Sequence, residues 1–224
     1  MSQEHVDLWR ARLNRHLYTS ILPTLADPYR VWFDQESRYK LRKELGLDGK
    51  IVLTYTGNVI CQWQRREAMC HFVGELSKKI PQLRFLAIVR KDDIDLMSAT
   101  LKKNGIESIT ILKSIQHQDM YQYLSAADVA LFLRHNHTMN NVVTSGKLGE
   151  YLAAGLPVIT TGSNAKVLND FIKGIDAGFF VDDDLGIDEN LFSYIKSIYE
   201  YKGDKEFRKR LSKETVKKFG GLDN

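Results

Sequence analysis

The stretch TSGKLGEYLAAGLPVITTG, residues 144–162, predicts a helix of about ten residues that turns through Gly-Leu-Pro into a short apolar strand. The first turn of this helix holds Ser145, Gly146 and Lys147 and no acidic residue. Backbone N–H groups lack partners at a helix N-terminus and the helix dipole is positive there, so a lysine is locally unfavourable unless an anion is bound. The stretch therefore indicates a helix followed by a strand, with an anion site at the start of the helix.

The same alternation continues in both directions along the chain. Predicted strands cover residues 51–57, 84–89, 108–113, 129–134, 157–162 and 178–181. Predicted helices cover residues 62–79, 93–104, 117–127, 145–154, 188–202 and 204–219, and a polar loop covers residues 135–141. The strands are near-continuous apolar runs, which is typical of parallel strands covered on both faces. Strands that alternate with helices predict an α/β fold with a Rossmann-like, doubly wound parallel sheet.

Residues 1–35 do not follow this alternation, and we expect them to form an N-terminal helix and a linker before a domain of residues 36–224. Apolar residues recur at helical spacing in residues 6–18, with arginines among them. This segment either packs as a helix on the flank of the domain or lies as a basic helix on a membrane surface. Residues 21–37 contain two prolines and indicate an extended linker, and residues 38–47 predict a short basic helix that leads into the first strand.

The composition is that of an ordinary globular protein. The 224 residues are 43% hydrophobic and 27% charged, which suffices for one domain with a sizeable core. A net charge of +4 is smaller than the strongly basic charge that is typical of nucleic-acid-binding domains, so we expect no nucleic-acid partner. The two cysteines form no disulfide framework, and neither a signal peptide nor an apolar run of membrane-spanning length is evident. We therefore expect a cytoplasmic protein, and the basic N-terminal helix leaves open a peripheral position at the inner face of the membrane.

Ligands of open α/β sheets bind at the carboxyl ends of the strands, so the residues that follow each predicted strand are site candidates. They are Gly57 and Asn58, Arg90 and Lys91, Lys113 to Ile115, His135 to Asn141, and Thr160 to Asn164. Arg90, Lys113 and Lys147 would share one rim of the sheet, which suits a phosphate-bearing ligand.

Each candidate also has a simpler structural interpretation. Gly57 can serve only a tight turn, and Arg90 and Lys113 can be solvated charges. Lys147 and Glu150, three residues apart on a helix, can form a surface ion pair.

Motifs for other ligands are absent from the sequence. GNVICQWQ, residues 57–64, is not the Gly-x-Gly-x-x-Gly dinucleotide motif, and TSGKL lacks the upstream glycine and the following hydroxyl residue of a P-loop. No spacing of cysteine and histidine indicates zinc. The acidic runs at residues 91–95 and 181–184 indicate solvated loop charge rather than a metal site, so we expect no metal.

Four stretches of the chain resemble one family of enzymes. SGKLGEYLAAGLPVITTG, residues 145–162, resembles the signature helix and strand in the C-terminal, donor-binding domain of GT-B glycosyltransferases, in particular of the retaining glycosyltransferase family 4. Residues 41–57 resemble the entry helix and first strand of that domain, and residues 22–34 resemble the linker before it. Residues 117–136 resemble its helix and strand around an Ala-Asp pair. The resemblance extends over roughly residues 20–220.

The resemblance implies that the chain binds a nucleotide diphosphate sugar, linked to UDP or GDP, as a substrate and needs no separate cofactor. Glu150 matches the family's glutamate that binds the ribose hydroxyls. Ser145 and Gly146 match the helix start whose N–H groups hold the diphosphate, and Lys147 would offset the charge that builds on the leaving group. The remaining matches are Ser114 and Ile115, where the base packs, and Gly57 and Asn58, close to the phosphates and the sugar.

The chain departs from the family at two motifs. The first glutamate of the family's Glu-x7-Glu motif falls at Val142. Asn141 or Thr144 is the candidate to contact the sugar hydroxyls in its place, and Asn141 joins Lys147 as a catalytic candidate. The family's basic pair after the first strand has no clear counterpart, because Arg65 and Arg66 stand beyond the expected place and neutral residues occupy it.

Members of this family place the active site between two similar domains, and this chain resembles only the C-terminal one. We therefore expect one half of a GT-B architecture, part of a hexosyl-type transferase of polysaccharide biosynthesis. It would need an N-terminal acceptor-binding domain as its partner and would transfer little or no sugar alone. Two other interpretations stay open: a nucleotide- or phosphate-binding α/β module without catalysis, and an epimerase of nucleotide sugars, whose related fold also uses two such domains.

Overall fold

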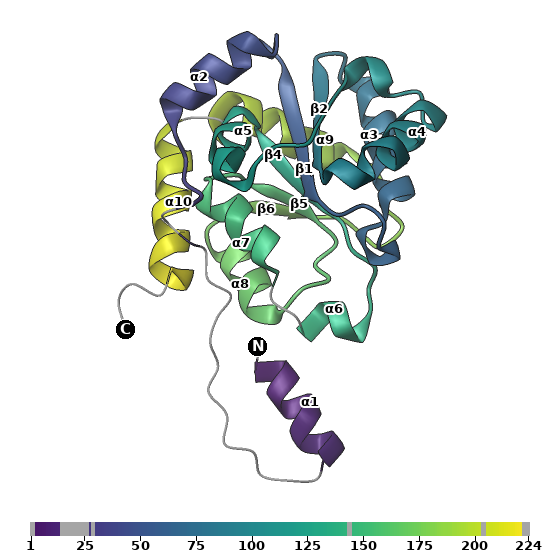
Figure 1. Cartoon of the computed structure of the whole chain (residues 1–224). Coiled ribbons are helices and arrows are strands. Elements are labelled where there is room, and N and C mark those ends of the chain that lie inside the picture. Colours follow the sequence, from purple (N-terminus) through teal and green to yellow (C-terminus); the bar gives the residue numbers. More distant parts are fainter. Residues whose placement is uncertain (1–2, 14–26, 28–29, 143–144, 203–204, 221–224) are drawn as a thin grey trace.

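The computed structural model describes residues 3–13, 27, 30–142, 145–202 and 205–220. Residues 21–26, 28 and 29 of the expected linker and the candidate site residue Thr144 lie outside these ranges. Helix α1 (Gln3–Leu13) lies beside α6 (Thr138–Val142), as Figure 1 shows, and buries Val6 while Trp9 and Leu13 are exposed.

The centre of the fold is a sheet of six parallel strands. The strands are β1 (Ile51–Gly57), β2 (Leu83–Val89), β3 (Thr110–Lys113), β4 (Val129–Phe132), β5 (Val158–Thr160) and β6 (Gly178–Phe180). Their order is β3-β2-β1-β4-β5-β6, and β1 pairs along its whole length with β2, from Ile51 opposite Leu83 to Gly57 opposite Val89. This order and direction confirm the predicted doubly wound parallel sheet.

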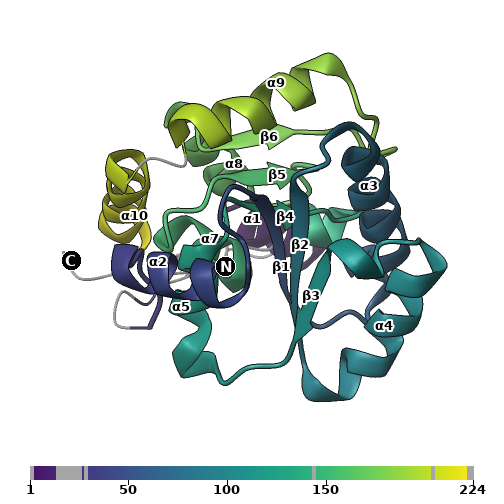
Figure 2. The same cartoon turned by 90° about the horizontal axis from the view of Figure 1, so that it is seen from above.

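Helices cover both faces of the sheet. The further helices are α2 (Gln35–Glu44), α3 (Arg66–Lys79), α4 (Ile94–Lys103), α5 (Met120–Ala126), α7 (Gly146–Ala153), α8 (Lys166–Gly174), α9 (Glu189–Ser197) and α10 (Lys205–Phe219). Short 3-10 turns precede three of them, among them η1 (Gln62–Gln64) before α3 and η4 (His117–Asp119) before α5. Figure 2 shows α3, α4 and α9 on one face and α2, α5, α7, α8 and α10 on the other. Alternate residues of each strand therefore enter two separate hydrophobic cores, which explains their continuous apolar runs.

Two helices differ from the sequence predictions. α8 was not predicted, although it buries Leu168 and Ile172, because its N-cap residue Ala165 offers no capping side chain as a start signal. The predicted polar loop at residues 135–141 contains part of α6, a helix of five residues that shows no apolar periodicity. Neither helix was predicted, because short helices are stabilised by tertiary contacts and these two lack local sequence signals.

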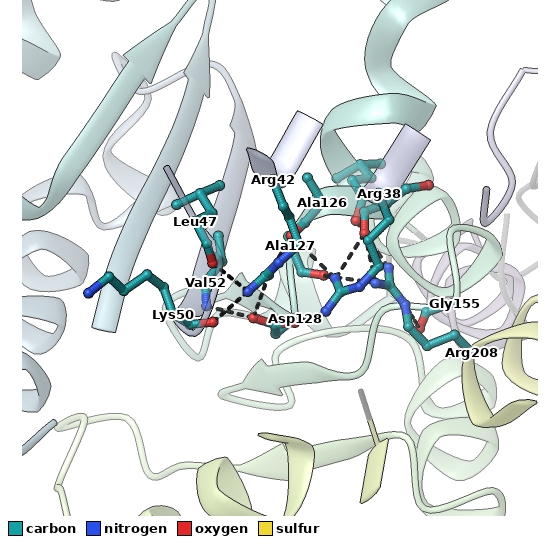
Figure 3. A network of polar contacts seen from close by, with 12 residues as sticks. Arg38, Arg42, Leu47, Lys50, Val52, Ala126, Ala127, Asp128, Gly155 and Arg208 are labelled. Carbon is teal, nitrogen blue, oxygen red and sulfur yellow. Dashed lines mark hydrogen bonds and ion pairs between the residues drawn. The ribbon is translucent and has the colours of Figure 1, made fainter. Parts of the chain in front are cut away.

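A buried carboxylate ties α2 to the sheet. Asp128, directly before β4, lies 2.5 Å from Nη2 of Arg38 and 3.1 Å from Nη1 of Arg42, and accepts the N–H of Val52 in β1 at 2.8 Å (Figure 3). Burial would raise the pKa of Asp128, but the two guanidinium groups outweigh it and hold the pKa below its ordinary value. One ionised side chain therefore binds both α2 and β1, beside the hydrogen bonds that Arg38 and Arg42 donate to backbone carbonyls.

Arg208 of α10 extends this network to α7 (Figure 3). Its fully buried guanidinium donates, at 2.8–3.2 Å, to carbonyl oxygens at the ends of α5 and α7, those of Leu124, Ser125, Ala127, Ala154 and Gly155. Because the carbonyl end of a helix carries partial negative charge, one arginine caps both helices. Gly155 has a φ of +67°, and a Cβ there would lie 2.4 Å from the carbonyl oxygen of Arg208, so both conformation and space require glycine.

We expect Asp128→Asn to lower the free energy of unfolding by about 3 kcal/mol, because it leaves Arg38 and Arg42 without their carboxylate. Urea denaturation followed by circular dichroism measures the change. Asp170→Asn is the matched control, since it makes the same substitution in an exposed pair with Lys166, and should cost less than about 1 kcal/mol. Equal effects of the two substitutions would contradict a central role for Asp128.

Candidate functional site

The strand order reverses between β1 and β4, and open α/β sheets bind ligands at the carboxyl ends of strands at such a point. Lys147, in the first turn of α7, reaches this point. Its Nζ donates to the hydroxyl of Tyr55 at 3.1 Å and to the side-chain oxygen of Gln64 at 3.3 Å, and lies 4.2 Å from the centre of the Tyr55 ring. Three elements, β1, η1 and α7, thus converge on one ammonium group.

Gly57, the last residue of β1, makes room for this lysine. Its φ of +116° is one that side chains rarely adopt, and a Cβ at this position would lie 2.9 Å from both Cε and Nζ of Lys147. Gly57 therefore both turns the chain at the end of β1 and leaves the space that the side chain of Lys147 occupies.

Lys147 and Arg134 are two half-buried cations to which no carboxylate of the described residues is hydrogen-bonded. Burial, and after it the charge of Arg134, lowers the pKa of Lys147 to about 7. The guanidinium of Arg134 lies 5.0 Å from the Phe132 ring centre, and its Nε and Nη1 are buried without a hydrogen-bond partner among the described residues. Burial also lowers the pKa of Arg134. An anion bound here would relieve the unfavourable burial of both charges.

The start of α7 lies at the same place with open backbone donors. Ser145 is the N-cap residue and is extended and buried, but its side chain makes no capping hydrogen bond. The first helical bond runs from the N–H of Gly149 to the carbonyl of Ser145 at 3.2 Å. The N–H groups of Gly146, Lys147 and Leu148 therefore have no partner within the helix and can bind an anion.

Glu150 lies one turn further along α7 and does not pair with Lys147, so the interpretation of these two residues as a surface ion pair is wrong. Its Oε1 is instead 3.3 Å from Nε2 of His117, in the 3-10 turn that follows β3. The Glu150 side chain is 29% exposed, which leaves it open to a ligand hydroxyl pair.

Three of the predicted site residues lie at this edge with their side chains already engaged. The side-chain oxygen of Asn58 accepts the N–H of Ile60 at 2.7 Å, and its carbonyl accepts the Tyr55 hydroxyl at 2.6 Å, so Asn58 shapes the turn after β1. Arg90 turns towards Asp93, at 3.2 Å. Asn141 in α6 donates from Nδ2 to the side-chain oxygen of Asn136 at 2.8 Å.

The loop after β3 holds the two residues predicted to receive the base. Ser114 is exposed and Ile115 is half-buried against the core on the α5 face. This loop leads directly into η4, which carries His117 and so places the loop near Glu150.

Four residues of this arrangement were not predicted as site residues: Tyr55, Gln64, Arg134 and His117. Arg134 follows the apolar residues of β4, and a charged residue after a buried strand was the available signal, which was overlooked because the strand was predicted to extend to residue 134. Tyr55 and Gln64 carried no signal, because their contact with Lys147 joins residues more than 80 positions apart.

One acidic run was also misinterpreted. Asp93 is not solvated but fully buried, where it accepts the N–H of Val59 at 3.1 Å and pairs with Arg90. Burial would raise the pKa of Asp93, yet these contacts hold it below its ordinary value. Within the described ranges, no three acidic, histidine or cysteine side chains gather as metal ligands, and no helix is long and apolar enough to cross a membrane.

Solved structures share this fold at low sequence identity. WaaG, a glycosyltransferase involved in lipopolysaccharide biosynthesis, matches all of this chain with 58% of its own, at 16% identity and a TM-score of 0.68. HepE of Anabaena, in complex with UDP-glucose, matches 86% of this chain with 51% of its own, at 15% identity and a TM-score of 0.62. The C-terminal domain of LpcC, a glycosyl transferase group 1 protein of Francisella tularensis, matches 88% of this chain with 99% of its own, at 12% identity and a TM-score of 0.55.

The chain thus spans little more than half the length of WaaG and HepE but nearly the whole of the LpcC domain. None of the curated protein sequences matches it significantly. The family model described as glycosyl transferases group 1 matches residues 50–198, which contain the whole sheet and the site around Lys147. Because this match extends over more than half of the chain, the chain belongs to the glycosyl transferases group 1 family.

Proposed function

We propose that the chain is the donor-binding domain of a retaining glycosyltransferase, in which Lys147 and Arg134 bind the diphosphate of a nucleotide diphosphate sugar. The observation that carries this proposal is the pair of half-buried cations at the switch point. Lys147 has only neutral hydrogen-bond partners among the described residues, and two buried nitrogens of Arg134 have none. The open N–H groups at the start of α7 add further donors for the same anion.

The position of the diphosphate implies where the ribose, the base and the sugar of the donor would lie. Glu150, one turn along α7, would accept hydrogen bonds from the ribose hydroxyls, and His117 would hold its carboxylate in place. The base would lie against Ser114 and Ile115 in the loop after β3. Asn141 of α6 stays our candidate for the sugar hydroxyls.

The same groups would assist the chemical step. Breaking the bond between sugar and phosphate leaves negative charge on the diphosphate, and cations fixed in advance stabilise that charge as it develops. Tyr55 and Gln64 fix Lys147 without neutralising it, because neither is charged. Transfer of a hexosyl group with retention is the reaction that the family resemblance suggests.

The relatives support UDP as the first nucleotide to test, since the HepE structure holds UDP-glucose, and GDP as the second. Because WaaG is almost twice as long as the matched part, we propose that an acceptor-binding domain completes the active site. The basic helix α1, with Trp9 and Leu13 exposed, keeps a peripheral membrane position open for the complete enzyme.

We expect Lys147→Met to weaken UDP binding about tenfold or more without destabilising the free chain. The substitution removes a charge-assisted contact to the diphosphate, but it also removes a cation whose burial is unfavourable. Calorimetric titration with UDP, without added metal, gives the affinity, and urea denaturation gives the stability. Lys78→Met, at an exposed lysine of α3, controls for the change in net charge. An unchanged affinity in Lys147→Met would contradict the assignment.

The variant Glu150→Ala should distinguish contacts to the ribose from contacts to the phosphates. If Glu150 binds the ribose hydroxyls, its loss weakens UDP binding about tenfold but leaves the binding of inorganic pyrophosphate unchanged. Lys147→Met should instead weaken both ligands. A loss of pyrophosphate binding in Glu150→Ala would show that the glutamate acts on the phosphate region and not on the ribose.

Affinity for UDP-glucose should fall as the pH rises above about 7. Burial lowers the pKa of Lys147 in the free chain to about 7. A bound diphosphate raises this pKa because it favours the ammonium form. Between the pKa of the free chain and that of the complex, binding is therefore accompanied by uptake of a proton. We expect the association constant to drop by up to about tenfold per pH unit above pH 7 and to level off below it. Lys147→Arg, which stays charged throughout, should show a flat profile. A flat profile in the unaltered chain would argue against a neutral lysine in the free state.

The described chain should bind donor but transfer almost no sugar by itself. Incubation with UDP-glucose and a panel of sugar acceptors, followed by chromatography, measures transfer. Steady turnover on any acceptor would overturn the proposal that a second domain is needed, while leaving donor binding intact.

A further inference from the structure

A pocket of about 370 Å³ lies next to η1 and close to the proposed diphosphate site. Its walls come from the turn after β1, the first turn of α3 and His135, which follows β4. Apolar side chains of Val59, Ile60 and Ala68 line part of it, and they suit the apolar face of a sugar ring.

The pocket contains the N-terminus of α3, and no side chain caps that end in the part of the chain that the structure describes. The N-cap residue is Arg65, with a left-handed backbone at a φ of +51°, and it makes no capping hydrogen bond. The first helical bond runs from the N–H of Met69 to the carbonyl of Arg65 at 2.8 Å. The positive end of α3, with its unpaired N–H groups, therefore faces an open space.

Two arginines that line the pocket keep donors without acceptors. The side chain of Arg65 is only 8% exposed, and its two terminal nitrogens bind Asp183, but its Nε is buried without a partner among the described residues. Arg66 donates from Nη1 to the carbonyl of Val59 at 3.1 Å, and its Nε is also buried without a partner in the same residues. Since an unpaired buried donor is costly, these two N–H groups point to an acceptor that the described residues do not supply.

The arginines that line the pocket also form ion pairs. Arg65 pairs with Asp183 at 3.0 Å, while Arg66 and Lys103 share Glu67 at 3.5 and 3.1 Å. Each of the two pocket arginines thus has a carboxylate partner for its terminal nitrogens, while its Nε–H stays without an acceptor among the described residues. The pocket favours an anion that brings its own acceptor oxygens.

We propose that this pocket binds an oxyanion carried by a sugar, a carboxylate or a phosphate, so that the enzyme handles an acidic saccharide. The proposal rests on the function proposed above, because it places the acidic sugar beside the diphosphate. The acidic group belongs either to the donor sugar or to the acceptor, and both present the same chemistry to Arg65 and Arg66.

The side-chain Nε–H signals of the ¹⁵N-labelled chain report this site directly. We expect D-glucuronate and D-glucose 6-phosphate, with and without UDP, to shift the Nε–H signals of Arg65 and Arg66 and the amide signals of Glu67 and Ala68. D-Glucose and sodium chloride at matched ionic strength should leave them unchanged. Absence of any shift specific to the acidic sugars would overturn the proposal. If the acidic sugars shift these signals but the chain does not bind UDP, the pocket binds acidic sugars and the proposed donor-binding function is wrong.

Arg65→Gly is the decisive variant, because glycine accepts the left-handed backbone and so keeps the turn while removing the guanidinium. It should abolish the response to the acidic sugars, whereas Lys103→Ala, with the same change in charge, should retain it. An equal response in Arg65→Gly and the unaltered chain would also overturn the proposal.

Calorimetry then distinguishes the two sources of the acidic group. Binding of UDP-glucuronate about tenfold tighter than UDP-glucose, lost in Arg65→Gly, assigns the acidic group to the donor. Equal affinities, together with shifts caused by free glucuronate beside bound UDP, assign it to the acceptor.

Discussion

The guanidinium of Arg208 fixes the carbonyl end of α7, and the candidate site depends on where α7 lies. Its hydrogen bonds join the ends of α5 and α7 to α10, and they suit the partial negative charge that helix carbonyls carry. The opposite end of the same eight-residue helix carries Lys147, a cation that the helix dipole disfavours. Stabilising contacts therefore gather at one end of α7, and the groups available to a ligand gather at the other.

The described helices differ in how their starts are capped. Asp34 caps α2 by accepting the N–H groups of Glu36 and Ser37, and Asp188 caps α9 by accepting that of Leu191. Neither α3 nor α7, which start beside the switch point of the sheet, has a capping side chain. The starts of α4, α5 and α8 likewise have no capping hydrogen bond from a side chain, so a missing cap does not by itself mark a helix end that binds an anion.

The fold could be predicted from the sequence because its signals are local. Continuous apolar runs marked all six strands, and the strand–helix alternation implied their parallel direction. The anion site at the start of α7 was also local, since Lys147 stands in the first turn without an acidic neighbour. Its partners Tyr55 and Gln64 could not be predicted, because only the folded sheet brings them together. The buried role of Asp93 was missed for the same reason: nothing in the run of acidic residues at 91–95 distinguishes the one that meets the N–H of Val59.

Adjacent residues at the end of η1 take part in two different clusters. Gln64 accepts from Lys147, whereas Arg65, the next residue, pairs with Asp183 and lines the second pocket. Arg65 has a left-handed backbone with a φ of +51°, a conformation that few residues other than glycine adopt. In the proposed complex one short segment would therefore position Lys147 for the diphosphate and also contact the acidic sugar, so a movement of η1 would affect both sites together.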